Sequence, residues 1–477
     1  MKKIIIIISL ILIPKLVFGA IDADTIWEFR STATANMVNG GGYNSTAVSA
    51  GTDYSQQDSA QLALTDLAST SASGWLTLTS TTGGFTAAMI GNIIRIASGT
   101  NFTAGWYEIT AYTNTNTVTV DRACGTVADA SVGVGKVGGA LNVGGSLEDD
   151  FFEQCVAGNI IYFMGAVTYT PSEAISLTIV GTSTLPIRVI GYNTIRGDNP
   201  TLANRPTIAV GASSITFNDF WYLSNLIFTG TGTNVVVTDG GSFISNCKST
   251  NSSATADRNA YGNSAAAGGT FYFNTEGIST AGDVLDLGAV TSMAIGCYFH
   301  DSKNGVNLST GDLYLSNSII DTNTTNAINI SSNGMVRGSN NTLYGAEIPT
   351  GVGINLSATA IKSMIYNTII YGFTTGISQT TAQLKSNFGD YNNFYNNTTD
   401  VTNYTKGSND IALDPGFTDA VNADFRVGAN MKAVGFPGSF ANMGAGASCI
   451  GYLDIGAVQR VEPSGGGGAR GARFLIQ

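Results

Sequence analysis

The sequence is poor in charged residues and in proline. Only 12% of its 477 residues are charged, about half of the usual share, and 9 are proline. A disordered chain would carry more charge and fewer large apolar residues than this one, which is 43% hydrophobic. The net charge of −11 argues against nucleic acid or an anionic membrane as the partner, because both are negative themselves.

The sequence also has few histidines and few cysteines, and the cysteines are not closely spaced. His300 is the single histidine, and the five cysteines are scattered without any CxxC spacing. A histidine–cysteine metal site therefore has too few ligands, and an odd number of unpatterned cysteines does not make a disulfide framework. We predict no metal and no cofactor, and we interpret the cysteines as small buried apolar residues.

The N-terminus, MKKIIIIISLILIPKLVFGA, has the parts of a secretory signal. Two lysines precede an apolar run too short to span a membrane comfortably, and Val17 and Gly19 are small residues suited to a cleavage site. An uncleaved anchor is the alternative. We predict that residues 1–19 are a signal peptide and that the exported chain has no membrane span.

A short motif recurs in the second half of the chain, at intervals of about 20 to 26 residues. A small polar pair is followed by an apolar pair and, a few residues later, by a small, an aliphatic and a polar residue. The copies include GCYFHD (296–301), NSIIDT (317–322), NTLYGA (341–346) and NTIIYG (367–372). Short runs of Ile, Val, Phe and Tyr between Ser, Thr and Asn favour strands over helices.

A period of this length, with short strands in each unit, predicts a solenoid of stacked coils. Asparagine tolerates the left-handed conformation that a sharp corner requires, and asparagines in successive coils can form a hydrogen-bonded ladder. Cys247 and Cys297 hold similar repeat positions two coils apart, or roughly 9–10 Å at the strand spacing. That separation is too long for a disulfide, so we predict two free thiols.

Three further stretches carry a family resemblance. SLEDDFFEQCVAGNIIYFMGAVTYT is similar to an amphipathic capping helix and a first strand, LTIVGTSTLPIRVIGYN to early coils, and DPGFTDAVNADFRVGANMKAVGF to a closing segment. Residues 141–460 thus resemble a right-handed parallel β-helix of the pectate-lyase-like superfamily. The end departs from the family pattern at GANMKAVGF, so the closing coil is expected to differ. The resemblance is specific for the fold and unspecific for function.

The remaining segments complete an all-β chain. Residues 73–140 have short alternating strands and Gly-rich turns, which predicts a small N-terminal β-module. Together with a leader at 20–72, this part resembles the leaders of β-helix proteins from bacteriophage particles. Residues 461–477 form a Gly-rich tail, interpreted as a flexible end or an attachment peptide.

The corner FHDSK is the best candidate for catalysis. It contains His300, Asp301 and Lys303, and the repeat alignment places Asp321 one coil later, over His300, with Glu347 in the following coil. The resemblance implies polysaccharide-cleaving chemistry by carboxylates with calcium and a base, or by paired aspartates. The alternative is a solvated corner whose charges keep a turn soluble.

Other polar pairs are weaker candidates. Asp283 and Asp286 have a spacing that predicts opposite faces of a strand. The RGD tripeptide at 196–198 is interpreted as part of a turn rather than as an adhesion motif.

Four aromatic residues are candidates for stacking on sugar rings. About half of the aromatic residues in a β-helix must face inward, so core packing is the competing interpretation. The candidates are Trp221, Tyr222, Tyr391 and Tyr395.

Two functions stay open. The first is a non-enzymatic, secreted or cell-surface protein, an adhesin or a tail-spike-like stalk, that binds extracellular polysaccharide and can form a homotrimer. The second is a polysaccharide lyase or glycoside hydrolase, with calcium as a cofactor if it is a lyase. Sparse charge and the phage-like leader favour the first, although a signal peptide is unusual for a phage particle. Convergence of Asp301, Asp321 and Lys303 in a groove would favour the second.

Overall fold

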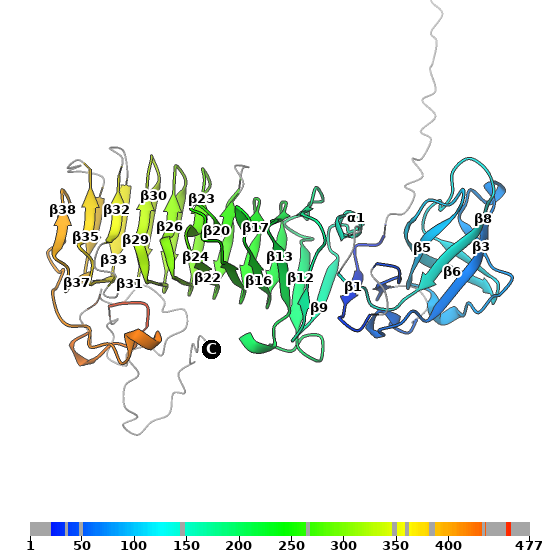
Figure 1. The fold of residues 1–477 in the computed structure, drawn as a ribbon, viewed down its shortest axis with the longest axis horizontal. Helices are drawn as coiled ribbons and strands as arrows, with labels where there is room; N and C mark the ends of the chain where they lie inside the picture. The colour runs from blue at the N-terminus through cyan, green and yellow to red at the C-terminus, as the bar shows by residue number, and fades with distance from the viewer. Residues whose placement is uncertain are drawn as a thin grey trace, which may run out of the picture.

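The computed structural model describes most of the chain. The described residues are 21–33, 37–46, 51–143, 148–263, 268–345, 351–357, 362–380, 387–431, 435 and 455–458. They form a parallel β-helix of three sheets with a closed β-barrel at one end (Figure 1), so the predicted all-β solenoid and N-terminal β-module are confirmed. The predicted signal peptide, Glu347 and the tail at 461–477 lie outside the described residues.

Each coil of the helix contributes one strand to each of three sheets. The first sheet contains β1 (Thr25–Phe29), β2 (Gly42–Asn44), β9 (Ile160–Met164), β12 (Ile187–Tyr192), β15 (Trp221–Ser224), β18 (Phe243–Ser245), β21 (Phe271–Phe273), β24 (Ser292–Ile295), β27 (Asp312–Ser316), β30 (Met335–Ser339), β33 (Lys362–Tyr366) and β36 (Asn387–Asp390).

The second sheet contains β10 (Thr168–Tyr169), β13 (Thr207–Gly211), β16 (Ile227–Gly230), β19 (Lys248–Asn251), β22 (Glu276–Ser279), β25 (Tyr298–His300), β28 (Ile319–Asp321), β31 (Thr342–Tyr344), β34 (Ile369–Tyr371) and β37 (Asn393–Tyr395). The third contains β11 (Ile175–Ser176), β14 (Ile215–Phe217), β17 (Asn234–Thr238), β20 (Asn259–Asn263), β23 (Asp283–Leu287), β26 (Ser302–Leu308), β29 (Asn323–Ile330), β32 (Val352–Leu356), β35 (Thr375–Gln379) and β38 (Thr399–Thr402).

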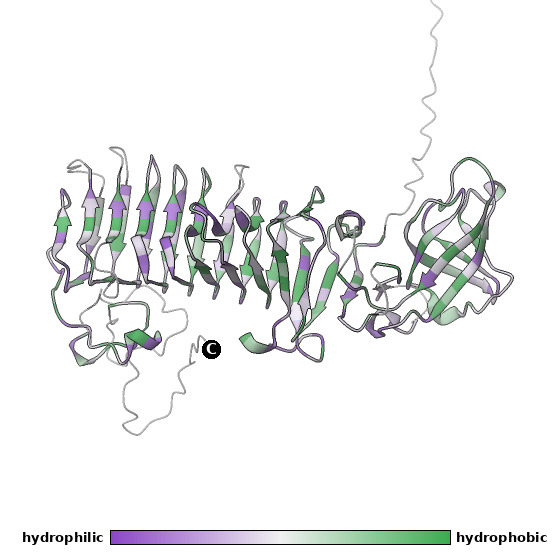
Figure 2. Ribbon diagram, in the orientation of Figure 1, coloured by the Kyte–Doolittle hydropathy of each residue, from purple (hydrophilic) through white to green (hydrophobic). Residues whose placement is uncertain are grey.

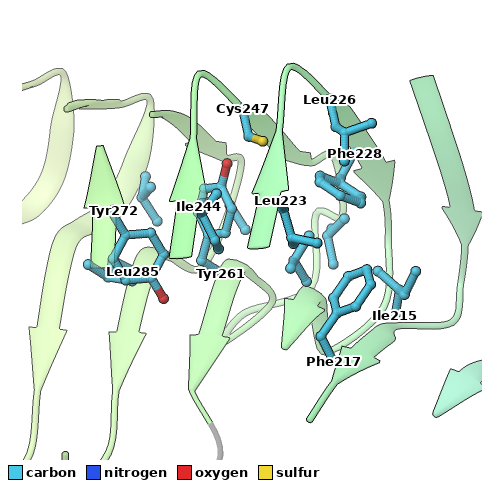
Figure 3. Close-up of a cluster of buried hydrophobic side chains, with 14 of the residues drawn as sticks. Ile215, Phe217, Leu223, Leu226, Phe228, Ile244, Cys247, Tyr261, Tyr272 and Leu285 are labelled. Carbon is cyan, nitrogen blue, oxygen red and sulfur yellow. The ribbon is translucent and has the colours of Figure 1, made fainter. Parts of the chain in front are cut away.

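The interior of the solenoid is filled by the inward side chains of all three sheets. Figure 3 shows one section of this core, where Ile244 lies between Leu223 and Tyr272 of the first sheet and Tyr261 of the third sheet contacts Tyr272. Hydrophobic and hydrophilic residues alternate along the strands (Figure 2), as expected for a wall with one buried face. Cys247 and Cys297 are buried free thiols, which confirms the prediction for this pair.

The corner after each strand of the first sheet explains the repeated polar pair. In eight successive coils the residue at this corner has a positive φ, and in six of them it is asparagine. Asparagine adopts this left-handed conformation at less cost than other residues with a side chain, so the motif marks the corners. The column consists of Asn225, Asn246, Asn274, Gly296, Asn317, Asn340, Asn367 and Tyr391.

The predicted asparagine ladder lies on the third sheet. The Asn329 amide donates to Asn307 Oδ1 at 2.9 Å, and the Asn355 amide donates to Asn329 Oδ1 at 2.9 Å. Asn307 in turn donates to Asp286 at 3.1 Å, so the ladder links four successive coils and holds them in one register.

The barrel consists of six strands: β3 (Leu62–Ser69), β4 (Thr77–Thr79), β5 (Ile93–Thr100), β6 (Gly105–Asn114), β7 (Thr117–Val120) and β8 (Ala130–Val137). It therefore begins at Leu62, before the boundary at 73 that the sequence suggested. The reason is that Leu64 and Leu67 of β3 fill the barrel core, and β3 pairs with β8 along its length.

The leader is likewise divided between the two parts rather than separate from them. β1 pairs in parallel with β9 and so covers the edge of the first sheet, which would otherwise expose unpaired backbone groups. The helix α1 (Glu148–Phe152) supplies the expected cap, with Phe151 packed against Trp27 of β1 and Trp106 of the barrel.

The chain after the last coil returns along the second sheet (Figure 1). Phe417 and Phe425 pack on Tyr344, and together with Ala457 they cover the outward side chains of Ile319 and Tyr344. The distal half of the outer face of this sheet is therefore buried.

Candidate functional site

The corner predicted to carry catalysis lies on the second sheet at the edge of its covered half, because Tyr298 packs against the cluster that contains Ile319 and Phe425. Tyr298 and His300 are alternate residues of β25, and their rings stack at 4.1 Å between centroids on the outer face. His300 Nδ1 lies 2.8 Å from Asp301 Oδ2, and His300 Nε2 lies 3.2 Å from Glu276 Oε1. Both ring nitrogens can donate only when the imidazole is protonated, so the geometry favours the cation.

Two residues that the sequence did not single out complete the cluster on one side. Glu276 of β22 aligns with Tyr298, and Lys248 of β19 aligns with Glu276. Lys248 Nζ lies 2.6 Å from the same Glu276 Oε1 that faces the histidine. The stretch NTEGIS at 274–279 is a further copy of the repeated motif, and aligning it would have placed Glu276 here.

Asp321 lies on the other side, one coil after His300. The register Tyr298↔Ile319 and Phe299↔Ile320 continues to put Asp321 beside His300, as the repeat alignment predicted. The Tyr298 hydroxyl donates to Asp321 Oδ2 at 3.0 Å, and Asp321 is only 4% exposed. We call Lys248, Glu276, Tyr298, His300, Asp301 and Asp321 the His300 cluster.

Burial and mutual charge set the protonation of this cluster. Burial raises the pKa of Asp321 to about 6, although the His300 charge and the Tyr298 hydroxyl act against it. Burial opposes the charged form of His300, but Glu276, Asp321 and Asp301 outweigh it and raise the histidine pKa. Burial also opposes the charge of Glu276, yet hydrogen bonds from His300 and Lys248 lower its pKa.

Lys303 does not join the cluster, contrary to the grouping suggested by the FHDSK corner. Asp301 has a φ of +52°, so the chain turns there and Lys303 enters β26 of the third sheet. Its Nζ lies 2.8 Å from Asp257 Oδ1. A base at Lys303 could therefore not work together with the carboxylates around His300.

Asp283 and Asp286 also differ from expectation, because they are not separated on opposite faces. Val284 and Leu285 between them are both fully buried, which breaks the strict alternation of the strand. Asn304 donates to Asp283 at 2.7 Å, and the pKa of Asp283 is raised to about 6, chiefly by burial and further by the charge of Asp286. The two carboxylates belong to the polar rows that link the coils.

The four aromatic candidates are not brought together. Trp221 is 0% exposed and donates its indole N–H to Ile179 inside the coil, so it is a core residue and the prediction of a sugar contact there is wrong. Tyr222 faces outward on the first sheet, and Tyr391 occupies a left-handed corner. Tyr395 continues the column of His300, Asp321, Tyr344 and Tyr371 on the second sheet.

In the part of the chain that the structure describes, no group of three or more His, Cys, Asp or Glu side chains has the geometry to hold a metal ion. The same described residues include no helix that is long and apolar enough to cross a membrane.

No protein-family model matches the sequence, and no curated protein matches it either. Among solved structures, pectate lyase Pel9A is similar at 14% identity, with a TM-score of 0.48 over 65% of this chain and 90% of that one. The catalytic domain of a GH87 α-1,3-glucanase in complex with nigerose is similar at 10% identity, over 74% of this chain and 88% of that one, with a TM-score of 0.28.

The tailspike protein gp49 from Pseudomonas phage LKA1 is similar at 12% identity, over 74% of this chain and 64% of that one, with a TM-score of 0.18. These likenesses assign no activity to this chain. Its own strand pairing makes it a parallel β-helix protein.

Proposed function

We propose that this chain is an exported, non-enzymatic β-helix protein of a cell surface or a phage particle, and that it binds glycan at the His300 cluster. The observation that carries the proposal is that the charges of this cluster are paired with one another on the outer face of the second sheet, where Asp301 is exposed and Lys248, Glu276 and His300 are partly exposed. Lys248 and His300 engage Glu276, and His300 engages Asp301.

The composition of the cluster suits sugar hydroxyls. Asp301 is 54% exposed at its side chain, so its carboxylate can accept hydrogen bonds from a ligand while it holds His300. Charge-assisted hydrogen bonds of this kind are stronger than neutral ones. The stacked Tyr298 and His300 rings add a rigid surface beside the carboxylates, with an apolar face and polar edges.

The ion pairs within the His300 cluster argue against catalysis. A general acid or base must reach the substrate with its proton or lone pair available. Glu276 and Asp301 are engaged by cations, and Lys303 lies on another sheet. Asp321 has a pKa suited to a general acid, but it is buried beneath Tyr298.

The alternative function is a polysaccharide lyase or glycoside hydrolase. One observation favours it, which is the raised pKa of Asp321 next to His300. Displacement of Tyr298 by a ligand would be needed to expose that acid.

The experiment is a combined binding and depolymerisation screen of residues 20–477 against acidic and neutral polysaccharides, with calcium and with chelator. We expect binding without new reducing ends or unsaturated products, and at least tenfold weaker binding in Glu276→Gln and His300→Ala. Lys303→Ala is the matched control and should bind normally. Products that disappear in Asp321→Asn would establish the enzyme instead, and absence of binding to every polysaccharide would refute the proposal.

A further inference from the structure

The outer face of the first sheet carries a continuous row of large side chains across eight coils. The strand register aligns one residue from each coil, and seven of the eight are aromatic or methionine. We call this the outer apolar row. It consists of Tyr222, Phe243, Phe271, Met293, Tyr314, Arg337, Met364 and Phe388.

These side chains reach solvent. Phe271 is 45% exposed and Phe388 is 56% exposed, and Tyr314 and Met364 are also exposed. Phe273 and Ile295, two positions further along their strands, widen the row on the same face. A contiguous apolar patch of this kind is often the functional surface of a protein.

The second sheet provides a contrast within the same molecule. Its outward Ile319 and Tyr344 are covered by Phe417 and Phe425 from the C-terminal segment. The described residues place no such cover on the outer apolar row, where the exposed fractions stay high.

We propose that a second copy of this chain covers the row, so that two copies associate face to face through their first sheets. Arg337 is the single charge in the row, and its guanidinium lies 4.6 Å from the centre of the Tyr314 ring. Asp312, two residues before Tyr314 on the same strand, lies 3.4 Å from Arg337 and compensates its charge, so a second copy brings few uncompensated like charges into opposition. A nearly straight row of this kind is complementary to itself under a two-fold axis.

The area of the row indicates that the contact between two copies is weak. Eight parallel strands span roughly 34 Å, and a strip about 15 Å wide gives about 500 Å² per copy. The pair then buries roughly 1,000 Å² in total, which is at the lower limit of specific interfaces. The dimer is therefore expected to be reversible and to form in the micromolar range.

The side chains favour a protein partner over a glycan on this face. Only Tyr222, Tyr314 and Arg337 of the row carry a hydrogen-bonding group for sugar hydroxyls. The other five side chains are Phe or Met, and two packed sheets about 10 Å apart bury such side chains against each other. The face-to-face arrangement also predicts two copies. A homotrimer would need two different surfaces in each contact.

The test is sedimentation velocity of residues 20–477 over a hundredfold range of concentration around 10 µM. We expect a monomer–dimer equilibrium whose dissociation constant rises at least tenfold in Phe271→Glu. Val127→Glu, at an exposed apolar residue of the barrel, is the matched control and should dimerise normally. Unchanged circular dichroism and thermal midpoint would show that Phe271→Glu is folded.

A second measurement locates the contact independently. Cys449, the one cysteine outside the described residues, is first replaced by serine so that it cannot form the disulfide. In this background Met293→Cys should give a covalent dimer on mild oxidation, because this row position lies near the proposed two-fold axis. A monomer at all concentrations, a trimer, or a dimer insensitive to Phe271→Glu would each overturn the proposal. A wild-type protein that stays monomeric but loses glycan binding in Phe271→Glu would identify the row as a glycan track instead.

Discussion

The guanidinium of Arg196 donates a hydrogen bond of 2.5 Å to the carboxylate of Glu28, which lies 168 residues earlier in the chain. The same guanidinium contacts Asp53 at 2.6 Å, so one side chain joins the leader to an early coil of the helix. Asp198, two residues on, accepts hydrogen bonds from the backbone of Asn193, at 2.7 Å, and of the two residues that follow it. The RGD tripeptide is therefore part of a turn, as its sequence indicates, and its arginine makes a structural ion pair.

Arg196→Ala should lower the free energy of unfolding by about 3–5 kcal/mol, because it leaves the carboxylate of Glu28 buried without a cation. Glu28 is 1% exposed, so water cannot replace the lost partner. Urea unfolding followed by circular dichroism measures the effect. Arg426→Ala, which breaks an exposed pair with Asp424, is the control and should change stability by less than about 1 kcal/mol. Equal losses in both variants would contradict the structural role of Arg196.

Asn329→Ala should cost about 1–3 kcal/mol, because it removes a donor to Asn307 and an acceptor from Asn355 in one ladder. Asn355→Ala removes one of these two bonds and should cost about half as much. Both are measured as shifts in the urea midpoint. A larger loss for Asn355→Ala than for Asn329→Ala would show that the ladder is not what holds these coils in register.

Asp321→Asn should stabilise the protein at pH 8 and have little effect below pH 4. The pKa of Asp321 is raised to about 6 by burial, so the folded state binds more protons than the unfolded state between pH 4 and 6. Stability therefore falls as pH rises through 6, by up to about 3 kcal/mol, and asparagine removes this loss. Unfolding free energies of both proteins from pH 4 to 8 test the slope.

The control for this series is Asp312→Asn, which lies on β27 and is partly exposed. It should change the free energy of unfolding by less than about 1 kcal/mol, because it breaks only the partly exposed pair of Asp312 with Arg337. A profile for Asp321→Asn that parallels the wild-type curve would mean that Asp321 ionises normally.

The four described cysteines should resist thiol reagents in the folded protein. Cys124, Cys155, Cys247 and Cys297 are buried and free, and burial raises the pKa of both Cys247 and Cys297 to about 12. In a Cys449→Ser background, Ellman's reagent should report almost no thiol in buffer and all four in urea. Rapid reaction of any of them without denaturant would contradict their burial.

Much of the fold follows from local features of the sequence. The recurring polar pair places asparagine where a left-handed corner needs it, and the alternation of apolar residues then defines the inward side of each strand. The DDFF stretch before the first full coil predicted the capping helix from local features as well, because Phe151 and Phe152 need a buried face. These are properties of a few neighbouring residues, and they repeat.

The candidate site could be predicted from the sequence only in part. Asp321 was placed beside His300 because both occupy the same position in adjacent copies of the motif. Glu276 was missed because NTEGIS has Glu-Gly where the other copies of the motif have an apolar pair, although its spacing to Tyr298 fits the period. Lys248 was missed because its coil lies 28 residues before that of Glu276, which exceeds the period. Lys303 was misplaced because the left-handed Asp301 sends the chain into another sheet, which sequence proximity does not reveal.

The sequence by itself determined that this protein is a rod of parallel strands, because period, corner residues and strand chemistry are local and mutually consistent. Only the tertiary structure decided which side chains share a face. Burial of the outer side of the second sheet by Phe417 and Phe425, exposure of the row through Phe271, and the ion pair of Arg196 with Glu28 all join residues far apart in the chain. Such contacts depend on how coils and caps pack in space, and no local pattern encodes them.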